Sequence, residues 1–258
     1  MQKTFSSILF LFGILFIMSQ ANAANPTPGT CPPGQHWVRS HPRRAFTRTD
    51  GTPVSATYVS ACCKPNPTAY KSWNTRLKEG MPPGWIQIHE KQKEWGPDEQ
   101  ERVLEALSDL PASLLVDKVR GIYRLEKSSS DDENPASGQP GEIALYDPAF
   151  DPKQNLTRIL AHEFAHEIFR QYSKSEEINY LAAADWIVFR NTKTGETRFI
   201  PNRDNYVEDD GKESPSEDFS NNLEYYLFDP NTLKEKTPKV FDWIQNKFGA
   251  NFKLVKGS

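Results

Sequence analysis

Apolar and polar residues follow one another along this chain in patterns that predict both helices and strands. Residues 97–110 carry apolar side chains at helical spacing, with proline at the first predicted position and directly after the last one. Residues 121–125 and 142–146 are short apolar segments typical of strands. The polar run between these two strands, residues 128–141, predicts a loop.

The C-terminal part of the chain continues the mixture of strands and helices. Apolar residues 186–189 and 197–200 flank a turn-forming stretch and predict a hairpin. The acidic, polar residues 202–213 predict a loop. Helical spacing returns in residues 214–228, which end before Asp-Pro, and in residues 238–248, which end before a glycine. Together these elements predict an α+β fold.

The central predicted helix, LTRILAHEFAHEIFRQY at residues 156–172, is apolar on almost every side. A helix with this pattern is buried in the core. It nevertheless contains two of the chain's five histidines, His162 and His166, with Glu163 between them. Burying three polar side chains is costly unless something satisfies them. The helix therefore indicates either a metal site or a core helix whose polar groups find protein partners.

The first residues, 1–23, match a cleavable signal peptide. The basic Lys3 precedes an apolar run from Ile8 to Met18, and Ala-Asn-Ala at residues 21–23 fits the cleavage rule. An uncleaved membrane anchor is the alternative, but it needs a run of ~20 apolar residues. We therefore expect a periplasmic or secreted protein that has no membrane association after signal cleavage.

Residues 24–66 predict a small β module closed by a disulfide. Cys31 is expected to pair with either Cys62 or Cys63 in an oxidising compartment, and the spacing does not decide which. The cysteine left over could serve as a zinc ligand in a latent state. This module contains four arginines but only one acidic residue, Asp50. They indicate either a binding face for an anionic surface polymer or a solvated strand face.

The remaining residues, 67–258, are sufficient for one medium-sized domain. No second long apolar run follows the signal peptide, so nothing else in the sequence indicates a membrane. The formal net charge of −3 is unremarkable. We expect a monomer with no nucleic-acid partner.

The spacing of His162, Glu163 and His166 is the H-E-x-x-H pattern of zinc-dependent hydrolases. Residues four apart lie on the same side of a helix, so both imidazoles can reach one Zn2+ ion. Glu163 projects about a quarter-turn away, where its carboxylate can act as the general base on a metal-activated water. The pattern therefore predicts hydrolysis of peptide bonds.

A catalytic zinc site normally takes a third protein ligand, and no histidine follows His166. A carboxylate on a helix packed against the first one is therefore expected. Glu217 and Glu224, both in residues 214–228, are the candidates. Ser214 and Glu217 also match a capping box, in which the carboxylate would cap its own helix. The spacing leaves these alternatives open.

HEFAH is followed about fifty residues later by SEDFSNNLEYYLFDP and then by a terminal helix. This arrangement resembles the gluzincin branch of the zincin metallopeptidases, in particular the catalytic domain of the anthrax lethal factor-like group. The resemblance implies a zincin-like α+β domain in which Glu217 is the third zinc ligand. It implies a tyrosine that stabilises the oxyanion, for which Tyr206 is the nearest upstream candidate. The chain departs from the family pattern at Ala165, where glycine is common, and at Asn221, where an acid is common.

The resemblance also implies that residues 143–146 form the sheet edge along which an extended peptide pairs. We expect an exported zinc-dependent endopeptidase whose substrate is a protein or peptide, peptidoglycan peptides included. The alternative is a cell-surface or cell-wall binding protein in which the arginine-rich module binds and the zinc domain is inactive or structural.

Overall fold

The computed structural model describes residues 73–85, 90–249 and 251–255, together with the backbone of six short strands before residue 73. The predicted signal peptide, Cys31 and the side chains of the arginine-rich module lie outside the described residues. No helix in the described part of the chain is long and apolar enough to cross a membrane.

The six N-terminal strands pair as three antiparallel ladders, β1 with β6, β2 with β5 and β3 with β4. Their bounds are Gln35–Val38 (β1), His41–Arg43 (β2), Phe46–Thr47 (β3), Pro53–Val54 (β4), Thr57–Val59 (β5) and Cys62–Pro65 (β6). These pairings agree with the predicted β structure of the module. The disulfide that was expected to close it stays a prediction, because Cys31 is not among the described residues.

The main sheet has four strands in the order β7-β8-β10-β9. Their bounds are Leu77–Lys78 (β7), Gly121–Arg124 (β8), Ala136–Gln139 (β9) and Glu142–Leu145 (β10). The two strands predicted from the sequence are β8 and β10, which pair in parallel, and β9 runs antiparallel to β10. The prediction of one loop over residues 128–141 is wrong, because β9 lies within it. Its residues Ser137, Gly138 and Gln139 lack the apolar alternation that signals a strand.

The edge of this sheet also differs from the expectation. Strand β10 has a neighbour on both sides, so it cannot add a substrate strand as predicted for residues 143–146. A tight turn at Pro140 and Gly141, where Gly141 has a φ of +83°, folds β9 back against β10. The edge available to a peptide on this side of the sheet is therefore β9.

The two faces of the sheet have different partners, because successive side chains of a strand point to opposite faces. Ile143 and Leu145 belong to the main core cluster, which also contains the buried residues of the helices. Ala144 and Tyr146 belong to a smaller cluster, against which Met81 and Trp85 pack. The sheet thus separates the helical side of the protein from the segment around residue 85.

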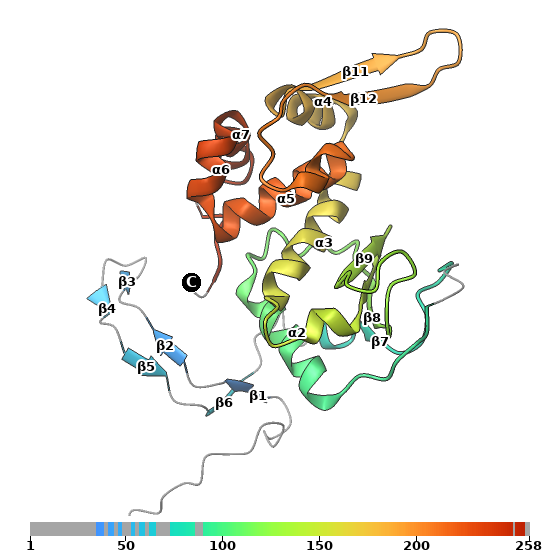
Figure 1. The fold of residues 1–258 in the computed structure, drawn as a ribbon. Helices are drawn as coiled ribbons and strands as arrows, with labels where there is room; N and C mark the ends of the chain where they lie inside the picture. The colour runs from blue at the N-terminus through green and yellow to red at the C-terminus, as the bar shows by residue number, and fades with distance from the viewer. Residues whose placement is uncertain are drawn as a thin grey trace, which may run out of the picture.

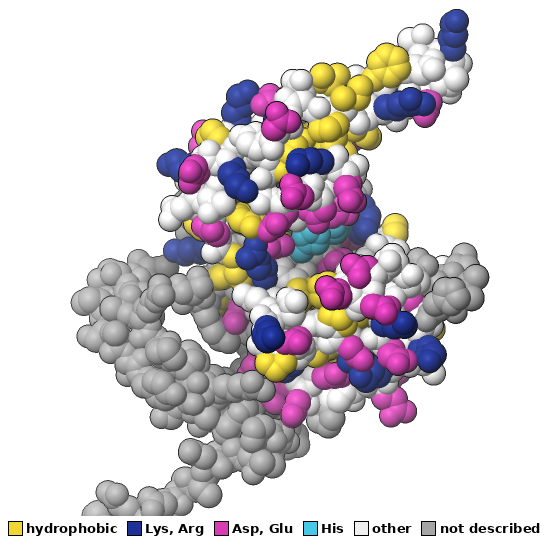
Figure 2. All heavy atoms as spheres, viewed as in Figure 1, with side chains coloured by type: hydrophobic (Ala, Val, Ile, Leu, Met, Phe, Trp, Pro, Cys, Tyr) yellow, Lys and Arg dark blue, Asp and Glu magenta, His cyan; other side chains and the backbone are white. Residues whose placement is uncertain are grey.

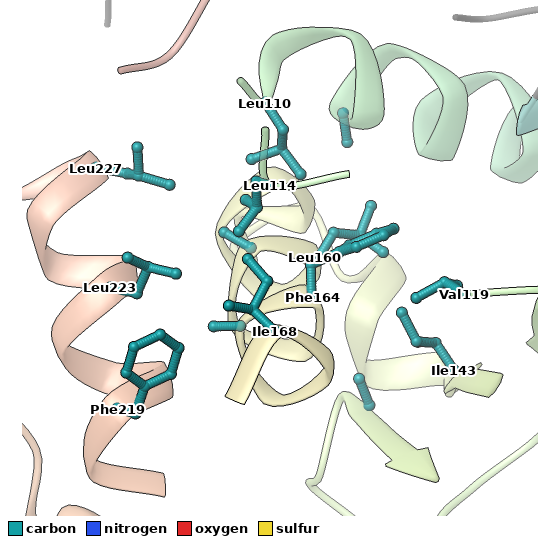
Figure 3. Packing of buried hydrophobic residues seen from close by; sticks show 14 of the residues in the cluster. Leu110, Leu114, Val119, Ile143, Leu160, Phe164, Ile168, Phe219, Leu223 and Leu227 are labelled. Atoms are coloured by element: carbon teal, nitrogen blue, oxygen red, sulfur yellow. The ribbon is translucent and has the colours of Figure 1, made fainter. Parts of the chain in front are cut away.

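The helices α2 (Pro97–Asp109), α3 (Leu156–Arg170), α5 (Pro215–Phe228) and α7 (Pro238–Phe248) confirm the four predicted from the sequence. The central helix is α3, and it is buried as its composition predicted. Figure 3 shows the buried residues of α3 between the leucines of α5 on one side and Val119 and Ile143 on the other. This packing brings α5 alongside α3.

Two short helices, α4 (Lys174–Ala183) and α6 (Pro230–Lys236), were not predicted. Three residues separate α3 from α4 and one residue separates α5 from α6, and each of the two short helices begins at a side chain that caps it. Ser173 accepts a hydrogen bond from the Glu176 amide, and Asp229 accepts one from the Thr232 amide. The Asp-Pro pair that was predicted to end residues 214–228 therefore also begins α6.

The hairpin predicted from residues 186–189 and 197–200 is confirmed. Strands β11 (Trp186–Arg190) and β12 (Thr197–Pro201) pair antiparallel, with Ile187 opposite Ile200. Figure 1 shows the hairpin extending away from the helices. The loop predicted over residues 202–213 holds one short 3-10 helix, η2 (Asp209–Lys212). The described part of the chain is therefore an α+β structure.

Candidate metal centre

The two motif histidines lie one turn apart on α3 and point to the same place. Asn155 caps the helix by accepting a hydrogen bond from the Arg158 amide, and the apolar residues around the motif hold α3 in the core. The Nε2 atoms of His162 and His166 are 3.0 Å apart. Both imidazoles therefore present the same ring nitrogen to one point at the surface of the helix.

Glu217 completes this group from the first turn of α5. Its Oε2 lies 3.4 Å from His162 Nε2 and 3.2 Å from His166 Nε2. The Ser214 hydroxyl does cap α5, by accepting a hydrogen bond from the Glu217 amide at 3.1 Å. The Glu217 carboxylate, however, faces the histidines. Glu217 thus takes part in the cap through its backbone and in the histidine cluster through its side chain.

Glu224 lies behind the cluster and contacts the opposite nitrogen of a histidine. Its Oε2 is 3.2 Å from His162 Nδ1, and its Oε1 accepts a hydrogen bond from Arg158. The Ser216 hydroxyl holds His166 in the same way, 2.8 Å from Nδ1. Partners on Nδ1 leave each Nε2 free for a metal. The geometry therefore places Glu217 at the ligand position and Glu224 in an orienting position.

The residues present fit a zinc ion. The ligand atoms of His162, His166 and Glu217 all lie within 4.8 Å of one another, and no other group of three such residues occurs in the described part of the chain. Ligands at ~2.0–2.1 Å in a tetrahedron are about 3.3 Å apart. The three distances here, 3.0, 3.2 and 3.4 Å, agree with that spacing. Two imidazoles and one carboxylate with an open fourth position are the donor set of a catalytic zinc site.

Glu163 lies beside this group with a carboxylate oxygen that has no partner. The residue is 7% exposed, and its buried Oε2 makes no hydrogen bond among the described residues. Gly138 of the edge strand β9 is its neighbour, since a Cβ built on Gly138 would come within 2.8 Å of that oxygen. A buried polar atom without a partner is costly. Because Glu163 also lines the cleft that holds the histidines, its carboxylate is the candidate proton acceptor of the site.

The histidines lie at the bottom of a cleft of about 1190 Å3. One wall is β9 with the loop before it, and the other is α5 with the segment before it. Figure 2 shows the histidines in this hollow with acidic side chains on both sides. Apart from the residues already described, the acids that line it are Asp131, Glu133, Glu208, Asp210 and Glu213. The cleft is therefore predominantly negative and attracts cationic groups.

The structure does not bring Tyr206 to this cleft. Tyr206 is 5% exposed and packs against Trp186 and Arg203, and its hydroxyl is buried without a hydrogen-bond partner. No tyrosine is among the described residues that line the cleft. The oxyanion role predicted for Tyr206 is not supported by its position. Asn221, which departs from the family pattern, lines the cleft and donates a hydrogen bond to Asp210 at 2.6 Å.

Three residues of the site were missed in the sequence. Ser216 contacts Nδ1 of His166, and Arg158 binds Glu224, which contacts Nδ1 of His162. Gly138 allows β9 to approach Glu163. Zinc histidines generally need a partner on the second ring nitrogen. That rule could have predicted Ser216, whose hydroxyl lies next to Glu217 in the sequence, as a partner of a motif histidine. No sequence signal indicated Gly138, because its importance depends on the pairing of β9.

The carboxylates around His162 control its protonation when no metal is bound. Burial disfavours the charged imidazole, but hydrogen bonds to Glu217 and Glu224 and the charge of Glu163 outweigh it and raise the pKa of His162 to about 10. Burial likewise opposes the charge of Glu217, yet the two histidines hold the pKa of its carboxyl well below its usual range. The metal-free site therefore carries a proton on His162 at neutral pH.

Zinc uptake is expected to release that proton, because a histidine ligand must be neutral. Below the raised pKa, apparent zinc affinity should rise by about tenfold per pH unit, since one proton is displaced. It should level off once His162 is neutral in the metal-free protein. Calorimetry at neutral pH in two buffers of different ionisation enthalpy measures the proton count. Glu126→Gln, which changes a charge outside the cleft, is the control and should release the same number of protons; zinc uptake by the unsubstituted protein without proton release would contradict this assignment.

Glu217 and Glu224 are expected to differ in their effect on zinc binding. Glu217→Gln removes a ligand charge, whereas Glu224→Gln removes only a partner of His162. The second change should weaken zinc binding by about 10- to 100-fold, and the first should weaken it more. Competition with a chelator of known affinity measures both. A larger loss for Glu224→Gln than for Glu217→Gln would exchange the two roles.

Three comparisons with known proteins found no relative of this chain. No family model matches the sequence, and searches of curated proteins and of solved structures gave no match.

Proposed function

We propose that this chain is an exported zinc-dependent endopeptidase with a zincin-like catalytic domain. The observation that carries the proposal is the convergence of His162, His166 and Glu217 beside the unpartnered carboxylate of Glu163. The two imidazoles and Glu217 would hold the ion, and Glu224 and Ser216 would orient the imidazoles. When bound, zinc lowers the pKa of a coordinated water to about 7 and polarises a carbonyl.

The chain's own groups have distinct tasks in such a reaction. Glu163 accepts the proton of the attacking water and passes it to the leaving amine, as a general base and then a general acid. An extended peptide adds to the edge strand β9, where backbone hydrogen bonds orient it across the cleft. Gly138 allows that strand to approach Glu163 closely, because a larger residue would clash with its carboxylate.

The backbone of β9 has room for this pairing. In an antiparallel ladder, residues alternate between those that bond the neighbouring strand and those that point to the free edge. Gln139 pairs with Glu142 across the tight turn, so Gly138 is the next residue whose backbone faces outward. Its carbonyl already accepts a hydrogen bond from Arg170 at 3.2 Å. The Gly138 amide remains the group that a substrate carbonyl would reach.

Metal analysis and peptide cleavage test this proposal. The purified protein should contain zinc or take up one equivalent, and the loaded protein should cut a peptide library, with loss of cleavage in a chelator and recovery on adding zinc. Peptidoglycan peptides and protein-derived peptides are separate arms of the library. A protein that binds no zinc, or that binds it and cuts neither arm, would rule out the proposed activity.

A further inference from the structure

A second, smaller cavity lies on the other side of the edge strand from α3. Its volume is about 170 Å3, roughly that of six water molecules in the liquid. This volume suits one long side chain rather than a whole ligand. Trp85, Glu90 and Ser137 are among its lining residues, and we call it the Glu90 pocket. It adjoins the main cleft, because Gly138 and Ser137 line both.

Glu90 is a buried carboxylate held by neutral donors. It is 9% exposed and accepts hydrogen bonds from the Trp85 indole, the Tyr146 hydroxyl at 3.1 Å and the Ser129 amide at 3.0 Å. The neighbouring lysines are engaged elsewhere, Lys91 with Glu126 and Lys93 with Asp147. Glu90 forms no ion pair with any residue that the structure describes. A buried charge is normally paired, so this pocket has negative charge available for a ligand.

Strand geometry directs substrate side chains to both sides of β9. Gly138 faces Glu163, and its cross-strand partner Ile143 faces the main core. Ser137 pairs with Ala144. The side chain of Ala144 belongs to the smaller cluster with Tyr146, against which Trp85 packs. A peptide strand added to β9 alternates in the same way. One set of its side chains therefore points toward the metal centre and the other set toward the side of the sheet that holds the Glu90 pocket.

We propose that the Glu90 pocket is a specificity subsite that binds a lysine or arginine side chain of a peptide paired with β9. The inference rests on the proposed peptidase function. The Trp85 indole can contact the cation through its ring, the Glu90 carboxylate supplies the opposite charge, and the Ser137 hydroxyl can accept a hydrogen bond. The acids Asp131 and Glu133 in the rim of the main cleft favour the approach of the same cation.

Binding without turnover provides the test. In the zinc-loaded Glu163→Gln protein, fluorescence anisotropy measures the affinity of labelled peptides that carry lysine, arginine, norleucine or glutamate at one position at a time. At one position, lysine or arginine should bind at least about tenfold tighter than norleucine, since a desolvated charge pair is formed. Glutamate should bind more weakly than norleucine there. If no position shows a preference for a cation, the proposal is wrong.

A second variant assigns that preference to the pocket. Adding Glu90→Gln to the Glu163→Gln protein removes the negative charge of the pocket. The ratio of the affinities for lysine and norleucine peptides at that position should then fall to near one. Glu235→Gln removes the same charge from an exposed position of α6 that lines neither cavity, and it should keep the ratio. If the ratio survives Glu90→Gln, the preference comes from the cleft rim and the subsite is refuted. If Glu90→Gln does not fold, the peptide series on the intact pocket still refutes the subsite when no position prefers a cation.

The outcomes for subsite and activity are distinguishable. A cationic preference in binding, together with no cleavage by the unsubstituted protein, would refute the peptidase and keep the subsite. Cleavage by the unsubstituted protein without any cationic preference would refute the subsite and keep the peptidase.

Discussion

Replacement of Glu163 by glutamine is expected to lower kcat on any peptide that the zinc-loaded protein cleaves by about 10²- to 10⁴-fold. Glutamine keeps the size of the side chain but cannot accept the proton of the attacking water. Zinc content should be unchanged, because Glu163 is not in the group of ligand atoms formed by His162, His166 and Glu217. Steady-state kinetics with metal analysis of the same preparations provide the measurement.

Glu126→Gln is the matched control for this change. Glu126 is half-exposed, pairs with Lys91 at 3.8 Å and lies away from the cleft. The control should keep the kcat of the unsubstituted protein. Full activity of Glu163→Gln would remove the general base from the proposal. Loss of zinc together with activity would make Glu163 a ligand instead.

Replacement of Asp218 by alanine is expected to destabilise the protein by about 3–5 kcal/mol. Asp218 is fully buried next to Glu217 on α5 and binds Arg203, whose side chain is also buried. It further accepts hydrogen bonds from Trp186 Nε1 at 2.8 Å and from Tyr180 at 3.1 Å. Removing the carboxylate leaves a buried cation and these donors without their acceptor, which costs more than the pair itself contributes.

Urea denaturation of the zinc-free protein measures this effect without the stabilisation that bound metal adds. Asp209→Ala is the control, because Asp209 is fully exposed and its one ion pair within the described residues is with Lys212. It should leave the unfolding midpoint in place. Zinc affinity should fall in Asp218→Ala, since the start of α5 carries Glu217. A loss of stability below about 1 kcal/mol, typical of a surface pair, would show that the network does not hold α5.

The predicted elements that were confirmed have strong local signals. Helix α3 is apolar on almost every side, and α2, α5 and α7 begin with proline at the first turn and carry regular apolar spacing. The hairpin of β11 and β12 has two apolar segments around a turn. In each case the local pattern and the final packing agree, because the same apolar side chains that define the pattern enter the core.

The elements that were missed depend on partners far away in the sequence. Strand β9 is polar, and it is a strand because Gly141 turns it back onto β10. Because β9 pairs with β10, the edge of the sheet is β9 and not β10 as the sequence had predicted. The Glu90 pocket likewise needs the sheet to bring residues near 85–90 next to Ser137. Neither pairing leaves a periodic signal in the chain.

The sequence by itself predicted that His162 and His166 converge, because their spacing on one helix places both imidazoles on the same side wherever that helix is packed. It also favoured a carboxylate as the proposed third ligand, since no histidine follows. Only the tertiary structure decided between Glu217 and Glu224, because that choice depends on how α5 packs against α3. It turned Glu217 toward the two Nε2 atoms and Glu224 toward Nδ1 of His162. It also left Tyr206 buried outside the cleft, because distance along the chain does not measure distance in space.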